Sequence, residues 1–262
     1  MKAITLHSIL PVREEPRESA EMGTQLLFGE MVEVLDEKPR WALVKADADS
    51  YEGWVDSKMI IKLSTEEAQQ VEVAYSGVPK MIKLPVAFAL SLGDMKTIPL
   101  AAGTRLPNYK NGQFELLGAH FQIDENAVSE PIVFNEQNFL AVSRFFLNCP
   151  YLWGGKNMFG YDCSGFTQVL FSLFGKQLPR QASQQAQVGE AVDFLVEAKI
   201  GDLAFFDYGD GGNIIHVGIL LDDKRILHCS GRVKIEQIDP NGIISTETKQ
   251  YTHNLRTIRR VF

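Results

Sequence analysis

The chain has 262 residues, of which 45% are hydrophobic and 10% aromatic, and its formal net charge is −7. This length fits one large domain or two to three small ones, and the hydrophobic content is ordinary for a globular protein. The negative charge, together with the lack of any basic block, argues against nucleic acid and against an anionic membrane surface as partners.

The N-terminal residues and the number of cysteines indicate where in the cell the protein is expected. Residues 1–11 hold a single lysine, no long apolar run and no Ala-x-Ala site, so they do not resemble a signal peptide. No stretch of the sequence is apolar enough to span a bilayer. The odd number of cysteines, three, argues against a disulfide framework. We therefore expect a cytoplasmic protein, or an exported one if a leader peptide was removed.

Residues 1–63 predict a small all-β barrel. Short β-like runs occur at 26–30, 31–35, 41–45 and 51–55, with turns between them. Several short strands at regular spacing are typical of a barrel or a sandwich. The Leu26–Glu30 run and the Gly53–Val55 run resemble bacterial SH3 domains.

Residues 64–130 predict a linker followed by a second module. Residues 64–75 are polar and acidic, and Ser64 and Glu67 have the spacing of a capping box at the start of a short helix. Residues 76–130 again contain strand-like runs, at 85–90, 96–100 and 114–118. They predict a second SH3-like barrel, although no Gly-Trp-Val run is present.

From residue 131 the pattern changes to helices followed by strands. Residues 136–146 have helical spacing behind Asn135, which is a plausible cap, and a second helix is predicted to begin close to Cys163. Strand-like runs dominate from Leu203 to the end of the sequence. Helices first and an antiparallel sheet later are an α+β layout, predicted here for residues 131–262.

Cys163 is the candidate nucleophile. It lies directly before an apolar run with helical spacing, so its backbone is expected at a helix N-terminus, where the helix dipole favours a thiolate. A thiolate is the form that attacks a carbonyl carbon. An isolated cysteine is more often a buried structural residue, the interpretation given to Cys149 and Cys229. The polar neighbours Asp162 and Ser164 argue against that interpretation for Cys163.

His216 and His228 are the candidate partners of the cysteine. Both lie in runs rich in Ile, Val and Leu, and residues 222–225 between them have the composition of a hairpin turn. Antiparallel pairing across a short turn can place the two imidazoles side by side. One can then act as base while the other orients it. A histidine on such a strand can also be an ordinary core residue, and His7, His120 and His253 are expected at the surface or in packing.

Six short motifs in this order resemble the NlpC/P60 cysteine peptidases, papain-like enzymes that cut bacterial cell-wall peptides. They are Tyr151–Gly155, Asp162–Gly165, Leu178–Arg180, Gly201–Leu203, His216–Gly218 and His228. The resemblance covers about the last half of the chain. It implies two SH3-like barrels followed by a papain-like α+β domain, with Cys163 as nucleophile, His216 as base and His228 as third member. It also implies that Tyr151 contributes to the oxyanion environment, beside the Cys163 N–H.

The arrangement of modules resembles the γ-D-glutamyl-L-diamino acid endopeptidases of wall-peptide recycling. Those enzymes act on L-Ala-γ-D-Glu-L-diamino acid peptides with a free N-terminal L-Ala, and their first barrel closes the substrate end of the site. By this resemblance, Glu21 and Tyr51 are expected to line that end. Further candidate substrate contacts are Asp162, Ser164, Ser183 and Trp153. Asp162 is expected to bind the substrate amine, or else to act only as a helix cap.

Other functions remain open at this point. The barrels could belong to a wall-binding protein with a degenerate catalytic domain, or the enzyme could cut intact peptidoglycan stems. An acyltransferase or amidase could use the same cysteine and histidine. A zinc site would usually show tight Cys or His spacing, which is missing here, so we expect neither a metal nor a cofactor.

Overall fold

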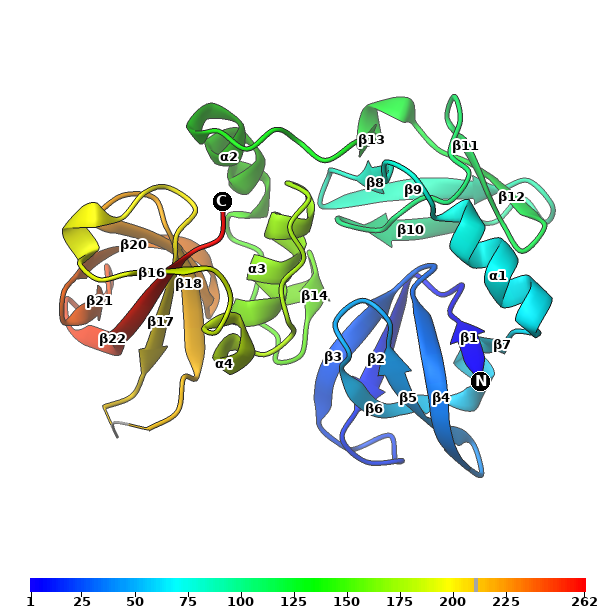
Figure 1. Cartoon of the computed structure of the whole chain (residues 1–262), viewed down its shortest axis with the longest axis horizontal. Coiled ribbons are helices and arrows are strands. Elements are labelled where there is room, and N and C mark those ends of the chain that lie inside the picture. Colours follow the sequence, from blue (N-terminus) through cyan, green and yellow to red (C-terminus); the bar gives the residue numbers. More distant parts are fainter. Residues whose placement is uncertain (210–211) are drawn as a thin grey trace. The chain divides into compact units, whose positions relative to one another are not determined.

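The computed structural model describes residues 1–209 and 212–262 and divides into two compact units (Figure 1). The first unit comprises Met1–Ile132 together with Lys156–Met158. The second comprises Val133–Gly155 and Phe159–Phe262. The division after Ile132 lies close to the predicted start of the last domain at 131. The predicted boundaries at 63 and 75 fall inside the first unit and stay predictions.

The first unit begins with an antiparallel sheet in the order β3-β2-β6-β5-β4-β1-β7. Side chains alternate between its faces, so Leu10 and Val12 of one strand and Val44 of another enter one apolar cluster. The elements are β1 (Lys2–Ile4), β2 (Ile9–Arg13), β3 (Met22–Leu27), β4 (Met31–Lys38), β5 (Trp41–Ala46), β6 (Glu52–Asp56), the 3-10 helix η1 (Ser57–Met59) and β7 (Ile61–Lys62).

The segment predicted as a linker is a packed helix, α1 (Thr65–Ala74). The predicted capping box is present: the Glu67 N–H donates to the Ser64 hydroxyl at 3.1 Å, and the Ser64 N–H donates to the Glu67 carboxylate at 2.8 Å. Val71 is buried in a cluster that also contains Ile4 of β1 and Phe28 of the turn after β3. One face of α1 therefore packs on this core, and the assignment of residues 64–75 as a linker between modules stays a prediction.

The rest of the first unit is a smaller antiparallel β region. Its sheets have the orders β10-β9-β12-β11 and β13-β8. Phe114 and Phe121 stack with ring centroids 4.8 Å apart and share the α1 cluster. The elements are β8 (Met81–Ile82), β9 (Val86–Ser91), β10 (Thr97–Ala101), β11 (Gln113–Leu116), β12 (Ala119–Gln122), η2 (Glu125–Ala127) and β13 (Val128–Ser129).

Helices lead the second unit, as predicted. The Asn138 N–H donates to the Asn135 side chain at 2.8 Å, so the predicted asparagine cap is confirmed, and the predicted second helix begins at Cys163. The short elements are α2 (Glu136–Ser143), η3 (Arg144–Phe146), β14 (Lys156–Asn157), β15 (Gly160–Tyr161), α3 (Cys163–Ser172), α4 (Ala182–Gln185) and η4 (Leu195–Glu197). Of these, β14 belongs to the first unit.

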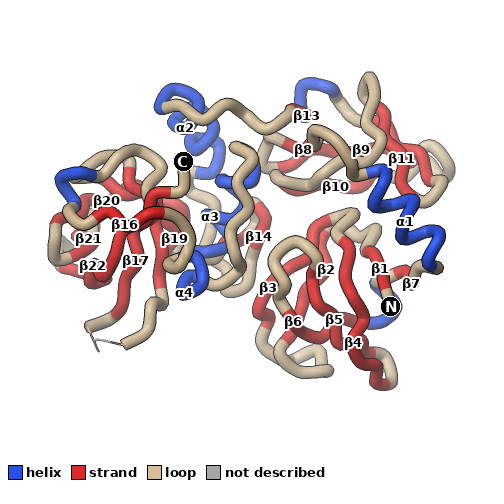
Figure 2. The backbone as a smooth tube through the Cα atoms, in the orientation of Figure 1, coloured by secondary structure: helices blue, strands red, loops and turns tan. Residues whose placement is uncertain are grey.

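The strands of the second unit form a barrel that the sequence did not predict. Within the described residues, β22 pairs with both β17 and β21, which closes the six strands β17–β22, and β16 pairs with residues 258–260 at the end of β22 (Figure 2). The strands are β16 (Glu190–Val192), β17 (Leu203–Asp207), β18 (His216–Leu220), β19 (Arg225–Ser230), β20 (Arg232–Asp239), β21 (Gly242–Ile244) and β22 (Tyr251–Arg260).

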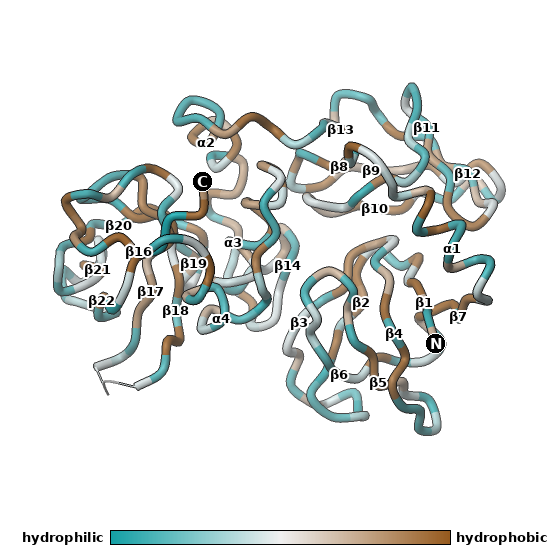
Figure 3. The backbone as a smooth tube through the Cα atoms, viewed as in Figure 1, coloured by the Kyte–Doolittle hydropathy of each residue, from teal (hydrophilic) through white to brown (hydrophobic). Residues whose placement is uncertain are grey.

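The two faces of these strands have different partners. Phe206, Ile226 and Ile238 join one apolar cluster inside the barrel, and hydrophobic segments run along the strands in Figure 3. Helix α3 packs against the outer side of β18 and β19. No helix within the described residues is long and apolar enough to cross a membrane.

Candidate active site

Cys163 is the first residue of α3, and Asp162 caps the helix. The backbone of Asp162 is extended, and its Oδ1 accepts a hydrogen bond from the Gly165 N–H at 2.6 Å. The thiol is buried, and backbone N–H groups of Ser164 and Val217 lie close enough to affect its ionisation. Because Val217 follows His216 in β18, these contacts place the thiol at the start of that strand.

Burial decides the protonation state of this thiol. Burial, and next the neighbouring Asp162 carboxylate, raise the pKa of Cys163 to about 12, although the two N–H groups and Arg180 oppose the shift. Burial therefore opposes the thiolate that the helix N-terminus is predicted to favour, and that prediction stays a prediction. A neutral thiol needs a base that removes its proton during attack.

The imidazoles of His216 and His228 lie side by side, as the hairpin predicted. The predicted turn is present between β18 and β19, and His216 Nε2 lies 2.9 Å from His228 Nδ1. Burial lowers the pKa of His216 well below 6.5, and the neighbouring His228 lowers it further, so His216 is neutral and able to accept a proton.

Gly218 makes room for this pair. It lies opposite His228 in the ladder, and a Cβ added there would lie 2.9 Å from the His228 Cβ and 2.7 Å from Ile226 Cδ1. A larger residue would have to push the imidazole or its neighbour aside. The His216–Gly218 motif therefore has a packing reason as well as a chemical one.

The sequence did not predict the groups on the far side of His228. His228 Nε2 lies 2.9 Å from Glu236 Oε2, and Lys234 Nζ lies 3.2 Å from the same oxygen. The N–H and hydroxyl of Thr246 donate to Glu236 Oε1 at 2.9 and 3.2 Å. The run 233–238 mixes apolar and charged residues without strict alternation, so no pattern in it indicated a buried carboxylate.

His253, predicted to lie at the surface or in packing, packs directly on the candidate base. Its ring stacks on His216 with centroids 4.2 Å apart and an interplanar angle of 26°. Burial, and next the nearby His228, lower the pKa of His253 to about 4. The ring is therefore neutral at neutral pH and covers one face of His216.

Asp162 forms a buried ion pair with Arg180. Arg180 donates to Asp162 Oδ1 at 3.1 Å and to Oδ2 at 2.5 Å, and its Nη1 also reaches the Ser164 hydroxyl at 2.8 Å. The Gly154 N–H donates to Oδ2 at 2.9 Å. The Gly165 and Gly154 N–H groups and Arg180 thus occupy both carboxylate oxygens of Asp162. Binding of a substrate amine by Asp162 or Ser164 stays a prediction.

The remaining candidates of the second unit differ in exposure. Tyr151 is half-buried, and burial, followed by the nearby Cys163 and Asp162, raises its pKa, so it keeps its phenolic proton. Trp153 and Ser183 are exposed. The oxyanion role of Tyr151 and the substrate roles of the other two stay predictions.

Glu21 and Tyr51 lie in the first unit. Glu21 is exposed, and the Tyr51 hydroxyl donates to a different carboxylate, that of Glu14. Their predicted place at the substrate end stays a prediction.

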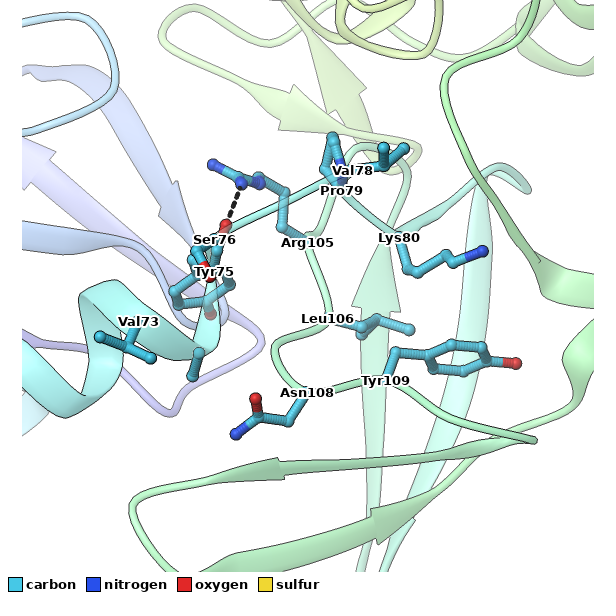
Figure 4. A pocket seen from close by; sticks show the side chains of 11 residues that line it. Val73, Tyr75, Ser76, Val78, Pro79, Lys80, Arg105, Leu106, Asn108 and Tyr109 are labelled. Atoms are coloured by element: carbon cyan, nitrogen blue, oxygen red, sulfur yellow. Dashed lines mark hydrogen bonds between the residues drawn. The ribbon is translucent and has the colours of Figure 1, made fainter.

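A separate cavity of about 200 Å³ lies in the first unit, between the end of α1 and the segment before β11 (Figure 4). Arg105 donates to the Tyr75 carbonyl at 3.0 Å beside it, and in Figure 4 the side chains of Lys80 and Tyr109 both point to the opposite side from Arg105. None of the predicted site residues lines this cavity.

Comparison with known proteins gives matches to two family models. Residues 148–255 match the NlpC/P60 family, and residues 12–60 match the bacterial dipeptidyl-peptidase Sh3 domain. The first match contains Cys163, His216 and His228.

Relatives cover most of the chain. A γ-D-glutamyl-L-lysine dipeptidyl-peptidase of Bacillus subtilis is 34% identical, over 91% of this chain and 81% of the relative. A protein of the same name from Bacillus cereus is 27% identical, over 84% of this chain and 71% of the relative. The crystal structure of an NlpC/P60 family protein from Bacillus cereus superposes with a TM-score of 0.83 at 22% identity, covering 100% of this chain and 99% of that one.

Proposed function

Because the chain belongs to the NlpC/P60 family of cysteine peptidases, with a bacterial SH3 domain ahead of the peptidase domain, we propose that it hydrolyses γ-D-glutamyl–L-diamino acid bonds in cell-wall peptides. The observation that carries the substrate is the 34% identity to a γ-D-glutamyl-L-lysine dipeptidyl-peptidase over 91% of the chain.

The proposed reaction passes through a thioester. His216 accepts the proton of the Cys163 thiol as the sulfur attacks the γ-carbonyl carbon of D-Glu. The tetrahedral intermediate collapses, the bond to the diamino acid breaks, and the leaving amine takes the proton from His216. Water then attacks the thioester with His216 as base, and the thiol is restored. The neutral states of thiol and imidazole suit this order of events.

Two further groups are proposed to support the chemistry. His228 holds the His216 ring through the 2.9 Å contact between the imidazoles. Tyr151 and the Cys163 N–H donate to the developing oxyanion. The raised pKa of Tyr151 supports this role, because only a protonated phenol can donate.

We also propose that the substrate must carry a free N-terminal amine, as on L-Ala. A dipeptidyl-peptidase releases two residues from an amino end, so its site has to end two residues before the scissile bond. Asp162, Ser164, Ser183, Trp153, Glu21 and Tyr51 are the residues proposed for that end.

Defined peptides test this proposal. L-Ala-γ-D-Glu-L-Lys and its diaminopimelate analogue should be cleaved after D-Glu, with the dipeptide identified by mass spectrometry. The N-acetylated peptide should lose about tenfold to hundredfold in kcat/KM, the size expected for one lost charge-assisted contact. Equal rates for free and acetylated peptides would instead favour a hydrolase of intact peptidoglycan stems.

A second SH3-like barrel at 76–130 is proposed from a repeated local feature. Asp56 caps η1 and Asp124 caps η2, with nearly the same backbone angles, and each 3-10 helix precedes a short strand of its sheet. A crystal structure in which 76–130 fails to superpose on 1–63 would contradict this assignment. The cytoplasmic location also stays a proposal, and cell fractionation checks it.

A further inference from the structure

The carboxylate of Glu236 contacts His228 on the side away from His216. Its side chain is buried, and each oxygen receives two donors: His228 and Lys234 on Oε2, and the N–H and hydroxyl of Thr246 on Oε1. A buried carboxylate with its acceptor sites occupied in this way has a fixed orientation.

We propose that Glu236 is a positioning residue that sets the tautomer of both imidazoles and so leaves Nδ1 of His216 as the atom that accepts the thiol proton. The inference rests on the proposed function, which makes His216 the base. Glu236 lies outside the six sequence motifs that resemble the cysteine peptidases.

The tautomers follow from counting donors along the chain of contacts. An ionised carboxylate can only accept, so His228 Nε2 must carry its proton. A neutral imidazole has one N–H, which leaves His228 Nδ1 as an acceptor. His216 Nε2 therefore donates across the 2.9 Å contact, and His216 Nδ1 is without a proton. Reversing either contact would leave His216 Nδ1 protonated and unable to act as the base.

The ionisation of Glu236 supports the first step. Burial raises its pKa, but hydrogen bonds from His228 and from the Thr246 N–H outweigh burial and lower the pKa of Glu236 to about 2. The other titratable groups that face this network are Lys234 on β20 and His253 on β22. Neither can take the place of Glu236 as the acceptor for His228, because a lysine only donates and His253 stacks on the other imidazole.

The carboxylate also matters once His216 is protonated. Burial and the neighbouring His228 disfavour a positive charge on His216. A negative charge two hydrogen bonds away stabilises that imidazolium through the intervening His228 ring. The effect is reduced by Lys234, which shares the same oxygen.

The variant Glu236→Gln separates orientation from simple packing. A glutamine has nearly the same shape but only one acceptor oxygen, so its NH₂ must face either the Thr246 N–H or the His228 and Lys234 donors. We expect kcat to fall on the order of 100-fold, the upper part of the range for loss of a group that orients a functional histidine, with KM changed less than about threefold.

The matched control is Glu247→Gln. It removes one carboxylate from the same domain, but Glu247 is exposed and pairs only at the surface, with Arg232 at 3.2 Å. Its kcat and KM should equal those of the unmutated protein.

Histidine tautomers are read directly by long-range ¹H–¹⁵N NMR of ¹⁵N-histidine-labelled protein. In the unmutated protein at pH 7.5, His216 and His228 should both carry their proton on Nε2. In Glu236→Gln the Nε2–H form of His228 should be lost or mixed with the Nδ1–H form, and Glu247→Gln should retain the unmutated pattern.

An Nδ1–H tautomer at either histidine of the unmutated protein would overturn the proposal, and this result needs no variant that could misfold. Unchanged kcat and unchanged tautomers in Glu236→Gln would overturn it as well. If the unmutated protein shows the expected tautomers but does not cleave the γ-D-glutamyl peptides, the proposed substrate is wrong and the role of Glu236 stands.

Discussion

The β1–β7 sheet of the first unit and the β17–β22 barrel of the second are both antiparallel, but the groups that they bury differ. The cluster buried by the β1–β7 sheet is made of Ala, Val, Leu and Ile side chains. The second has an apolar cluster beside a chain of polar groups that runs from His216 through His228 to Glu236. Apolar filling gives stability alone, whereas a buried polar chain is tolerated only where its donors and acceptors are paired.

Removing the nucleophile should have the largest effect and should separate activity from stability. Cys163→Ala should abolish peptide hydrolysis, a loss on the order of 10⁶-fold in kcat. Its melting temperature should stay close to that of the unmutated protein, because a small apolar side chain replaces another in a buried place. Cys149→Ala is the control and should remain active. Hydrolysis by Cys163→Ala would disprove the nucleophile assignment.

His228→Ala should interrupt the chain of polar groups in the β17–β22 barrel, because His228 lies between His216 and Glu236. We expect kcat to fall by up to about 10⁴-fold, because His216 loses the partner that holds its tautomer, with a smaller change in KM. His120 is exposed in the first unit, so steady-state kinetics of His120→Ala give the matched control. An unchanged kcat for His228→Ala would mean that another group orients His216.

Asp162→Ala should show how much stability the second unit draws from a buried ion pair. The change leaves the Arg180 guanidinium buried without its carboxylate and removes the α3 cap, and we expect a loss of about 3–5 kcal/mol in urea unfolding. Glu247→Ala, which breaks the exposed pair with Arg232, should cost less than about 1 kcal/mol. Similar losses for the two variants would contradict the picture of a buried pair.

Acid should weaken the β17–β22 barrel before it weakens the first unit. A histidine whose pKa is lower in the folded than in the unfolded chain favours folding above the unfolded value of about 6.5, and this contribution is lost as pH falls toward the folded pKa. The pKa values of His216, His228 and His253 are all lowered, mainly by burial. For His253, with a folded pKa of about 4, the loss reaches roughly 3 kcal/mol.

Hydrogen exchange measured between pH 6.5 and 4 checks this expectation, after correction for the intrinsic rate. Protection should fall in β17–β22 and persist in the first unit, where His7 and His120 are exposed. His253→Phe keeps an aromatic ring on His216 and should reduce the acid sensitivity. Equal loss of protection in the two units would show that the histidines are not the cause.

Much of this arrangement could be predicted from local signals. The capping box of α1, the Asn135 cap, the start of α3 at Cys163 and the β18–β19 hairpin each depend on a few neighbouring residues. The family comparisons then confirmed the NlpC/P60 family and a bacterial SH3 domain. Barrel closure was not predicted, because it depends on pairing of β22 with β17 and β21, which are distant in sequence.

The site residues that lie in a sequence motif were predicted. Those that only the fold brings together were missed. His216 and His228 are twelve residues apart in one hairpin. Glu236 reaches them from the next strand, and His253 reaches them from the last strand of the barrel. Arg180 lies in the Leu178–Arg180 motif, but the motif does not show that Arg180 pairs with Asp162. That pairing requires the turn that follows α3. The pKa of Cys163 also depends on burial, which sequence alone does not give.

The buried places of Ile4 and Phe28 limit how this protein can be engineered. Ile4 belongs to β1 and Phe28 to the turn after β3, yet both lie in the cluster formed by α1 and the β8–β13 region. A fragment cut after residue 63 would expose both side chains to water, because α1 and the β8–β13 region that cover them would be missing. The β1–β7 sheet therefore cannot be exchanged alone. A chimera should take the whole first unit, residues 1–132 with 156–158, and a crossover within α1 should give protein that aggregates.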